Sequence, residues 1–339
     1  MYQKKDDLSA LIYSLSNGEK RYLHNVFKEE TPTGDKPMYL QLFETLKNRK
    51  SQTPNNNSAT SGRVLTANKR FLLKHILKNL RTLHEELSTN IILNNKLSDI
   101  EIIYNHGLSD QAMVILNKAH RIAEEQEKFS LLLQILDWEK RLAISVNNPV
   151  RSIETINEEE IQVLRKMLQI NNLVGLYSRI VLLKKKHGYA KGAIREMVET
   201  EIIQSVDFPS EKECLSEKAK FYHNLIFSIY YWMTYQHLNE FKSSKALLSE
   251  KVHNILISDY VGGIHQHITS CVCLLRFNEA LQGLKISQIY IEKNYSNDSN
   301  PNKQNYIAHF ISYNLIIYGY KGEMAQLSEI LWSVKERIS

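Results

Sequence analysis

Four basic residues spaced three or four apart have the spacing of an anion-binding surface. In a helix over residues 67–87 their side chains project within an arc of about 80°, because each residue turns the helix by about 100°. Leucine and isoleucine side chains occupy a separate arc, so this helix is expected to dock by one face and present its charges from another. Several cations on one face displace counterions from nucleic-acid phosphate. The predicted anion-binding stripe consists of Arg70, Lys74, Lys78 and Arg81.

A second interpretation of the stripe stays open. Basic helix faces are often only solvated, or they pair with acids elsewhere in the fold, such as the run at residues 158–160. No base-reading module accompanies the stripe, and the spacing over residues 8–50 does not support a helix-turn-helix.

Residues 265–273 hold four side chains of metal-binding type. On a helix only His267 and Cys271 share a face, while His265 and Cys273 point away from that pair. A tetrahedral site needs all four ligands to converge, and no partner C-x-x-C exists in the chain. We therefore expect a packed helix here, with no metal and no cofactor.

Aromatic residues crowd the stretch 221–235. Three in a row, at 230, 231 and 232, cannot all face one direction, so the helix is expected to be apolar nearly all round and packed between neighbours. The alternative is that some of these rings line a groove, because an aromatic body with a polar tip suits peptide binding. The predicted partner-groove residues are Tyr231, Tyr235 and Tyr313.

No catalytic signature is present in the sequence. The chain has no G-x-x-x-x-G-K-[ST], no H-E-x-x-H, no G-x-S-x-G and no kinase set. Low glycine content also disfavours loops that cradle phosphate. We therefore expect no catalytic residues and a protein that is not an enzyme.

The elements that position these residues are expected to be helices. Among 339 residues there are 12 Gly and 6 Pro, too few for a Rossmann-type sheet or a turn-rich all-β fold. Three cysteines do not make a disulfide framework and indicate a reducing compartment. Acidic residues stand where a signal peptide needs an apolar stretch, and no run approaches the ~18 apolar residues of a membrane span. We expect a cytoplasmic protein with no membrane partner.

The formal charge of +6 is concentrated near the N-terminus. Residues 1–90 hold 15 Lys and Arg against 9 Asp and Glu, whereas the remaining residues hold 28 of each. Residues 45–84 contain nine basic residues and no acid. We therefore predict a basic N-terminal helical module over 1–90, with a flexible, uncharged surface loop at 51–62, and a second domain over 91–339.

Helix signals recur along the chain. Capping boxes are predicted at Ser16 with Glu19, at Thr155 with Glu158 and at Ser210 with Glu213, starting helices near 17, 156 and 211. An apolar stripe runs along residues 108–123. Short turns are predicted at five small or polar residues, each before a further helical stretch: Gly107, Gly188, Asn239, Arg276 and Gly322.

The segment from Gly107 to Ala112, with Leu116 and Ala119 after it, resembles the second helix of the tetratricopeptide (TPR-like) repeat. A looser match runs from Phe277 to Ala280, with Leu284 after it. The chain also resembles a class of bacterial helical-repeat proteins with a Lys-Arg-Tyr-Leu segment near the start, a likeness that implies no activity. The TPR resemblance implies a right-handed α-solenoid of stacked helical hairpins, whose concave face binds a peptide or protein.

These observations lead us to expect one of two functions. The first is a non-enzymatic scaffold that binds a protein or peptide in the groove of the repeats. The second is a nucleic-acid-associated regulator, in which the basic N-terminal module meets DNA or RNA and the repeats act as a sensor or dimerisation arm. The partner and the oligomeric state are not contained in the sequence.

Overall fold

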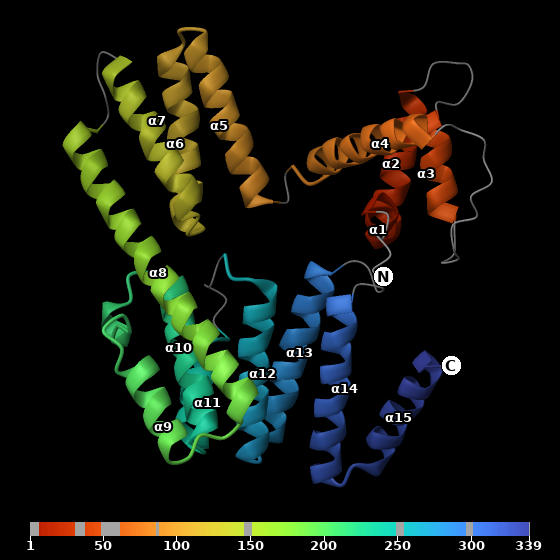
Figure 1. Ribbon diagram of the computed structural model, residues 1–339, viewed down its shortest axis with the longest axis vertical. Coiled ribbons are helices and arrows are strands. Elements are labelled where there is room, and N and C mark those ends of the chain that lie inside the picture. The colour runs from red at the N-terminus through yellow and green to blue at the C-terminus, as the bar shows by residue number, and fades with distance from the viewer. Residues whose placement is uncertain are drawn as a thin grey trace. The chain divides into compact units, whose positions relative to one another are not determined.

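The protein is all-helical, as the low glycine and proline content predicts (Figure 1). A computed structural model describes residues 7–30, 38–48, 62–85, 88–145, 151–248, 254–295 and 301–338. These ranges contain fifteen α-helices and no strand. Within them, no helix combines the length and apolar character that crossing a membrane requires. The predicted loop at 51–62 lies outside the described residues, except for Gly62, at which α4 begins.

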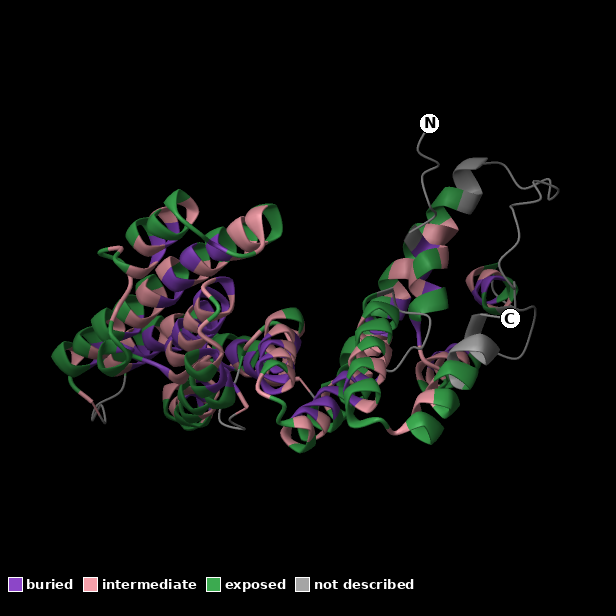
Figure 2. Ribbon diagram, turned by 90° about the horizontal axis from the view of Figure 1, so that it is seen from below, coloured by how far each residue is buried: buried purple, intermediate pink, exposed green. Residues whose placement is uncertain are grey.

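The chain divides into two compact units. One comprises residues 1–92 with 295–304, and the other comprises residues 93–294 with 305–339. In most helices of both units, buried residues run along one side and exposed residues along the other (Figure 2), whereas the helix over residues 217–233 has no exposed residue, as its aromatic sequence predicts. The one-sided pattern is typical of amphipathic helices that cover a shared core.

The N-terminal unit contains four helices around one apolar core: α1 (Asp7–Ser14), α2 (Asn17–Glu29), α3 (Met38–Asn48) and α4 (Gly62–Leu83). Phe27 of α2 is fully buried at the centre, with its ring edge-on to Phe43 of α3 at 5.3 Å and stacked on His75 of α4 at 4.9 Å. The capping box predicted at Ser16 and Glu19 is confirmed, and α2 begins at the expected residue. The basic residues of α4 are thus carried by a helix whose other face is fixed in a core.

Three histidine–glutamate pairs join the helices of this unit. The imidazole Nε2 atoms lie within hydrogen-bond distance of carboxylate oxygens on another helix or just beyond its end. The pairs are His24 with Glu44 (3.3 Å), His75 with Glu30 (2.5 Å) and His84 with Glu19 (3.0 Å). Three acids of the unit are therefore engaged by histidines.

The remaining helices succeed one another along the chain. They are α5 (Thr89–Asn105), α6 (Ser109–Glu125), α7 (Phe129–Ser145), α8 (Ile153–His187), α9 (Ala193–Val198) continued by a π-helix η1 (Glu199–Ile203), a 3₁₀ turn η2 (Glu211–Glu213), α10 (Glu217–Met233), α11 (His237–Ala246), α12 (Ile257–Cys273), α13 (Phe277–Asn294), α14 (Pro301–Lys321) and α15 (Met324–Ile338). Two apolar clusters form the core of the second unit. The predicted stripe on α6 is confirmed at Ala112, Leu116 and Ala119, which are fully buried, whereas Leu108 lies exposed before the helix.

Two of the predicted helix starts are corrected. α8 begins at Ile153 and not near 156, because Ser152, three residues before Thr155, accepts the backbone N–H of Thr155 and acts as the cap. The capping box of Ser210 and Glu213 is present, but it closes only the 3₁₀ turn, and α10 starts at Glu217 behind Ser216. A capping-box pattern thus marks the start of a helical turn without fixing how long that turn continues.

One turn geometry joins five pairs of consecutive helices. In each turn one residue adopts a left-handed conformation, and the next residue donates its backbone N–H to the carbonyl five positions earlier, as in a Schellman motif. These bonds run from 108 to 103, 128 to 123, 236 to 231, 276 to 271 and 323 to 318. The left-handed residues are Gly107 (φ 77°), Glu127 (49°), Tyr235 (59°), Leu275 (58°) and Gly322 (72°).

The predicted turn at Asn239 is wrong. Asn239 lies inside α11, and the turn is built around Tyr235, four residues earlier. With this correction, α10 and α11 begin 40 residues before α12 and α13 respectively, at 217 against 257 and at 237 against 277. The helix starts of the two hairpins therefore align in the sequence with a constant offset of 40 residues and no gap.

The contacts of α12 with α8 and with α14 advance in step along the helices. Lys184 of α8 contacts Gln266 of α12, and Tyr177 contacts Asp259, both 82 residues apart. His265 and His309, and Thr269 and Tyr313, join α12 to α14 at a constant separation of 44. Equal steps along both partners mean that α8, α12 and α14 run in the same direction side by side.

Candidate functional site

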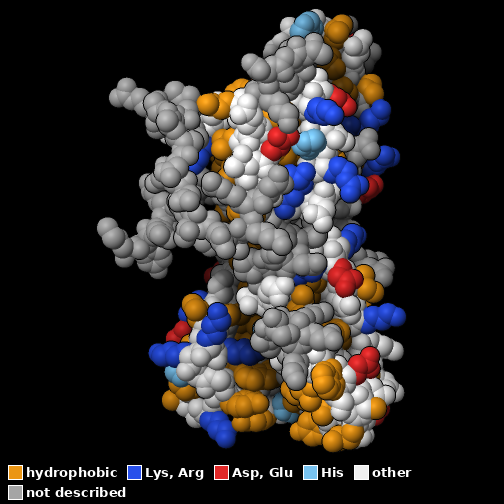
Figure 3. Space-filling model, turned by 90° about the vertical axis from the view of Figure 1, so that its right-hand side faces the viewer, with side chains coloured by type: hydrophobic (Ala, Val, Ile, Leu, Met, Phe, Trp, Pro, Cys, Tyr) orange, Lys and Arg blue, Asp and Glu red, His pale blue; other side chains and the backbone are white. Residues whose placement is uncertain are grey.

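All four residues of the predicted anion-binding stripe are exposed on α4. Arg70, Lys74, Lys78 and Arg81 lie on the side of the helix opposite the buried Leu72, Ile76 and Asn79. None of the four forms an ion pair within the described ranges. Figure 3 shows Lys and Arg side chains over the N-terminal unit, with hydrophobic side chains among them.

Two large apolar side chains share the exposed side of α4. Phe71 is 52% exposed and Leu77 is 41% exposed. Phe71 also packs against the ring of Tyr39 at 5.2 Å and stacks on His75 at 5.5 Å, so its position is set by the core behind it. The basic face is therefore held in position by the core, and it contains two separate apolar side chains.

In the second unit, a carboxylate occupies a position that other hairpins fill with a small or apolar residue. Five residues after each left-handed turn residue the chain packs closely against the preceding helix. Glu240 stands at this position in α11 and is 0% exposed. The equivalent residues of the other hairpins are Ala112, Leu132, Ala280 and Leu327.

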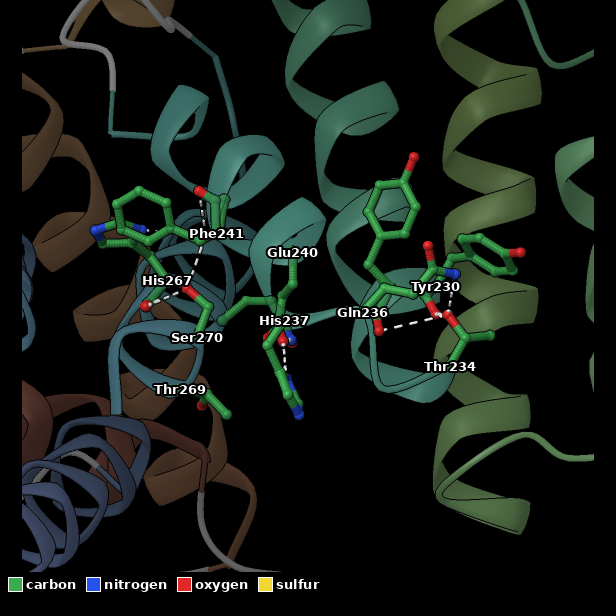
Figure 4. A network of polar contacts seen from close by, with 12 residues as sticks. Tyr230, Thr234, Gln236, His237, Glu240, Phe241, His267, Thr269 and Ser270 are labelled. Carbon is green, nitrogen blue, oxygen red and sulfur yellow. Dashed lines mark hydrogen bonds and ion pairs between the residues drawn. The ribbon is translucent and has the colours of Figure 1, made fainter. Parts of the chain in front are cut away.

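Glu240 has hydrogen-bond partners on α11 and α12. His237 Nδ1 lies 2.9 Å from its Oε2 (Figure 4). The Gln266 amide donates to its Oε1 at 2.6 Å. Lys184 Nζ in turn donates to the Gln266 side-chain oxygen at 3.0 Å. Burial raises the pKa of Glu240 and lowers the pKa of Lys184. The network joins α8, α11 and α12 through one buried carboxylate.

We call a row of five residues on one side of α12, bordered by α8 and α14, the α12 face; three are half-buried, Gln266 is buried and Cys273 is exposed. Its members are spaced three or four residues apart and so point the same way. They are Asp259, Gly262, Gln266, Thr269 and Cys273.

The two ends of the α12 face differ in polarity. At one end Asp259 accepts hydrogen bonds from Tyr222 at 2.6 Å and from Tyr177 at 3.5 Å. At the other end lies Cys273, an exposed residue whose thiol is partly desolvated by its neighbours, so that this desolvation and the charge of Glu240 raise its pKa. Tyr313 of α14 borders this end, with its hydroxyl 2.9 Å from that of Thr269.

An aromatic stack lies beside the same end of the face. The ring of Tyr189 stacks on Tyr235 at 3.9 Å and on Trp232 at 4.6 Å. Lys184 Nζ lies 4.4 Å from the centre of the Trp232 ring, and Lys191 Nζ lies 5.5 Å from that of Tyr235. Burial raises the pKa of Tyr189, and Tyr235, Cys273 and Glu240 contribute in the same direction. The stack is partly exposed and flanked by cations.

The three tyrosines of the predicted partner groove do not share one location. Tyr235 belongs to the aromatic stack, and Tyr313 borders the α12 face. Tyr231 instead stacks on Phe227 at 5.5 Å, one turn earlier on α10. The sequence does not single out Tyr189 as a groove residue. Its position directly after Gly188, in a predicted turn at the end of α8, is a local sign that it lies near the surface.

Residues 265–273 lie on α12, as expected, and only His267 and Cys271 approach each other. Their Nε2 and Sγ atoms are 3.5 Å apart and both residues are buried. Burial lowers the pKa of His267 to about 4 and raises that of Cys271 to about 12. Across the ranges given above, no group of three or more His, Cys, Asp or Glu side chains is placed to hold a metal ion.

The α12 face and the aromatic stack together offer hydrogen-bonding groups, aromatic rings and one thiol along a helix. This combination is suited to holding an extended chain by its backbone and side chains. No known protein family, curated protein or solved structure matches this chain.

Proposed function

We propose that the protein is a non-enzymatic, TPR-like helical-repeat scaffold that binds an extended protein or peptide segment on the α12 face. The observation that carries the proposal is the row from Asp259 to Cys273, bordered by tyrosines of α8 and α14. The row spans 15 residues of helix, or about 21 Å, the length of six or seven residues of extended chain.

The repeat assignment has two supports. The same left-handed turn joins five pairs of helices, and the hairpins at 217 and 257 succeed one another at an interval of 40 residues. This interval is typical of helical-hairpin repeats, whose stacked helices build extended binding surfaces. Three free thiols support a reducing, cytoplasmic setting.

The proposed ligand contacts divide by chemistry. Thr269 and the Tyr313 hydroxyl would bond the peptide backbone, and the stack of Tyr189 and Tyr235 would hold an apolar or proline side chain. Asp259, already bonded by two tyrosines, and the buried Glu240 network would keep the face in place.

A selection from a random-peptide display library tests the proposal. Peptides selected on the full chain are measured by fluorescence anisotropy against the wild type and against Thr269→Arg and Cys273→Arg, each of which puts a long charged side chain on the α12 face. We expect both variants to weaken binding at least tenfold. Gln282→Arg, on an exposed position of α13, adds the same charge elsewhere and should leave binding unchanged. Equal affinity of all four proteins would refute the assignment of the face.

A further inference from the structure

We propose that the exposed face of α4 binds the phosphate backbone of a double-stranded nucleic acid without reading its sequence. This activity is separate from peptide binding on the α12 face and rests on other residues. The four cations, Arg70, Lys74, Lys78 and Arg81, stand on one side of the helix and span 12 residues, or about 17 Å. A duplex carries one negative charge per about 1.7 Å of its axis when both strands are counted, so the phosphates along this length outnumber the four cations.

The cations of this face have no competing partner in the described structure. None of the four forms an ion pair there, and Glu85 is the first acid after residue 44 along the chain. Three acids of this unit, Glu19, Glu30 and Glu44, each lie against a histidine of another segment. An unneutralised row of cations attracts a polyanion by releasing its condensed counterions.

The face has the composition of a backbone-binding surface. Among its exposed positions from 66 to 82 there is no Asn or Gln, the side chains that pair with adenine, and no acid that would accept from cytosine. Lysine and arginine contacts to phosphate fix position but carry little sequence information. The face is therefore expected to contact the backbone and not the base edges.

A membrane surface is the less suitable partner. A helix that lies in a bilayer interface needs its apolar face free to insert. In α4 the apolar face is packed in the core, with Leu72 and Ile76 fully buried, and only Phe71 and Leu77 stand out among the cations. Two separated side chains do not form an inserting stripe.

The salt dependence of duplex binding tests the inference quantitatively. A fluorescent 20-base-pair DNA of mixed sequence is titrated with the full chain at several salt concentrations. If all four cations neutralise a phosphate, log K falls with log salt with a slope of about −3.6, a loss of about 150-fold between 50 and 200 mM. Each single change, such as Lys74→Gln, should reduce the slope by about 0.9.

A matched pair of quadruple variants separates a site from general charge. Changing Arg70, Lys74, Lys78 and Arg81 to Gln should abolish measurable binding. Changing Arg165, Lys242, Lys285 and Lys293 to Gln removes the same net charge from exposed positions of the second unit and should preserve both affinity and slope. Circular dichroism and urea unfolding establish that both variants are folded.

Three results would overturn the inference. One is an equal loss of binding in both quadruple variants, which would mean attraction by net charge alone. Another is competition by polyglutamate or by anionic lipid vesicles that matches the duplex at equal charge. The third is a preference of tenfold or more for one duplex sequence over others. Binding of the selected peptides should be unchanged in the α4 variant, so this test and that of the proposed function fail independently.

Discussion

At the scale of single residues, the second unit is distinguished by polar groups inside its helix pairs. Glu240 occupies a position where sister hairpins place alanine or leucine, and it is satisfied by His237 and Gln266. A buried polar group is costly unless it has hydrogen-bond partners. Departures from the local packing rule tend to occur where a protein has a function, which agrees with the place of Glu240 beneath the α12 face.

His267 makes the second unit sensitive to acid. Burial lowers the pKa of His267 to about 4, below the ordinary value near 6.5 that the unfolded chain has. Between these values the unfolded chain binds the proton and the native protein does not, so the free energy of unfolding falls as the pH falls. By pH 5 the loss from this residue is about 2 kcal/mol. His265, with a pKa also lowered to about 4, acts in the same direction.

Urea unfolding at pH 7 and pH 5 measures this effect. We expect His267→Gln to lose less stability than the wild type when the pH is lowered, because the position no longer titrates. His106→Gln, at an exposed histidine, should keep the full pH dependence. If His267→Gln behaved like the wild type, proton binding at this residue would not be the cause.

At the scale of elements, the recurring turn explains how the helices are joined. It also shows at which residues the left-handed backbone conformation costs stability. Gly107 and Gly322 adopt the left-handed conformation without steric penalty, because glycine has no Cβ. A Cβ added at either position would meet no atom of another part of the chain within 4 Å. A side chain there would therefore be disfavoured only by the backbone conformation. Leu275 adopts the same conformation as a branched, exposed residue. Such a conformation costs a residue with a side chain about 1 kcal/mol or more.

Replacing Leu275 by glycine should therefore stabilise the second unit by about 1 kcal/mol. Leu256→Gly is the matched control, because Leu256 is equally exposed but has an ordinary φ of −62°. There glycine only increases the freedom of the unfolded chain and should be neutral or destabilising. Urea midpoints of the two variants give the comparison, and a loss of stability in Leu275→Gly would contradict the account of the turn.

The sequence predicts the helices better than it predicts the site. Low glycine and proline content, the apolar stripe on α6 and the Ser16 capping box do not depend on distant partners. The structure confirms the helices that they predict. Tyr235 gives no local sign of a left-handed turn, so the turn was expected at Asn239. The burial of Glu240 depends on Gln266, 26 residues later, and no local pattern reveals such a partner.

At the scale of the whole molecule, the two units have separate apolar cores. The core of the first unit includes Phe27, Phe43 and Ile76, and none of its residues belongs to the clusters of the second. All the excess positive charge lies in residues 1–90. The first unit therefore has its own core and carries the excess positive charge, whereas the second unit has separate cores and a balanced charge.

This division predicts two unfolding transitions that can be told apart by probe. The three tryptophans, Trp138, Trp232 and Trp332, all lie in the second unit, so their fluorescence reports on that unit, while circular dichroism reports on both. Phe27→Ala should destabilise the first unit by about 3–5 kcal/mol. It should shift the circular dichroism transition and leave the fluorescence transition in place. A matching shift in fluorescence would show that the units unfold together.

The arrangement of the three thiols has a practical consequence. Cys214 and Cys271 are buried, with pKa values raised to about 11 and about 12, whereas Cys273 is exposed at the end of the α12 face. Maleimide dyes react with the thiolate, so they should attach at Cys273 first, and faster as the pH is raised. An environment-sensitive fluorophore at this position would report a peptide bound at the proposed site directly, without any engineered cysteine.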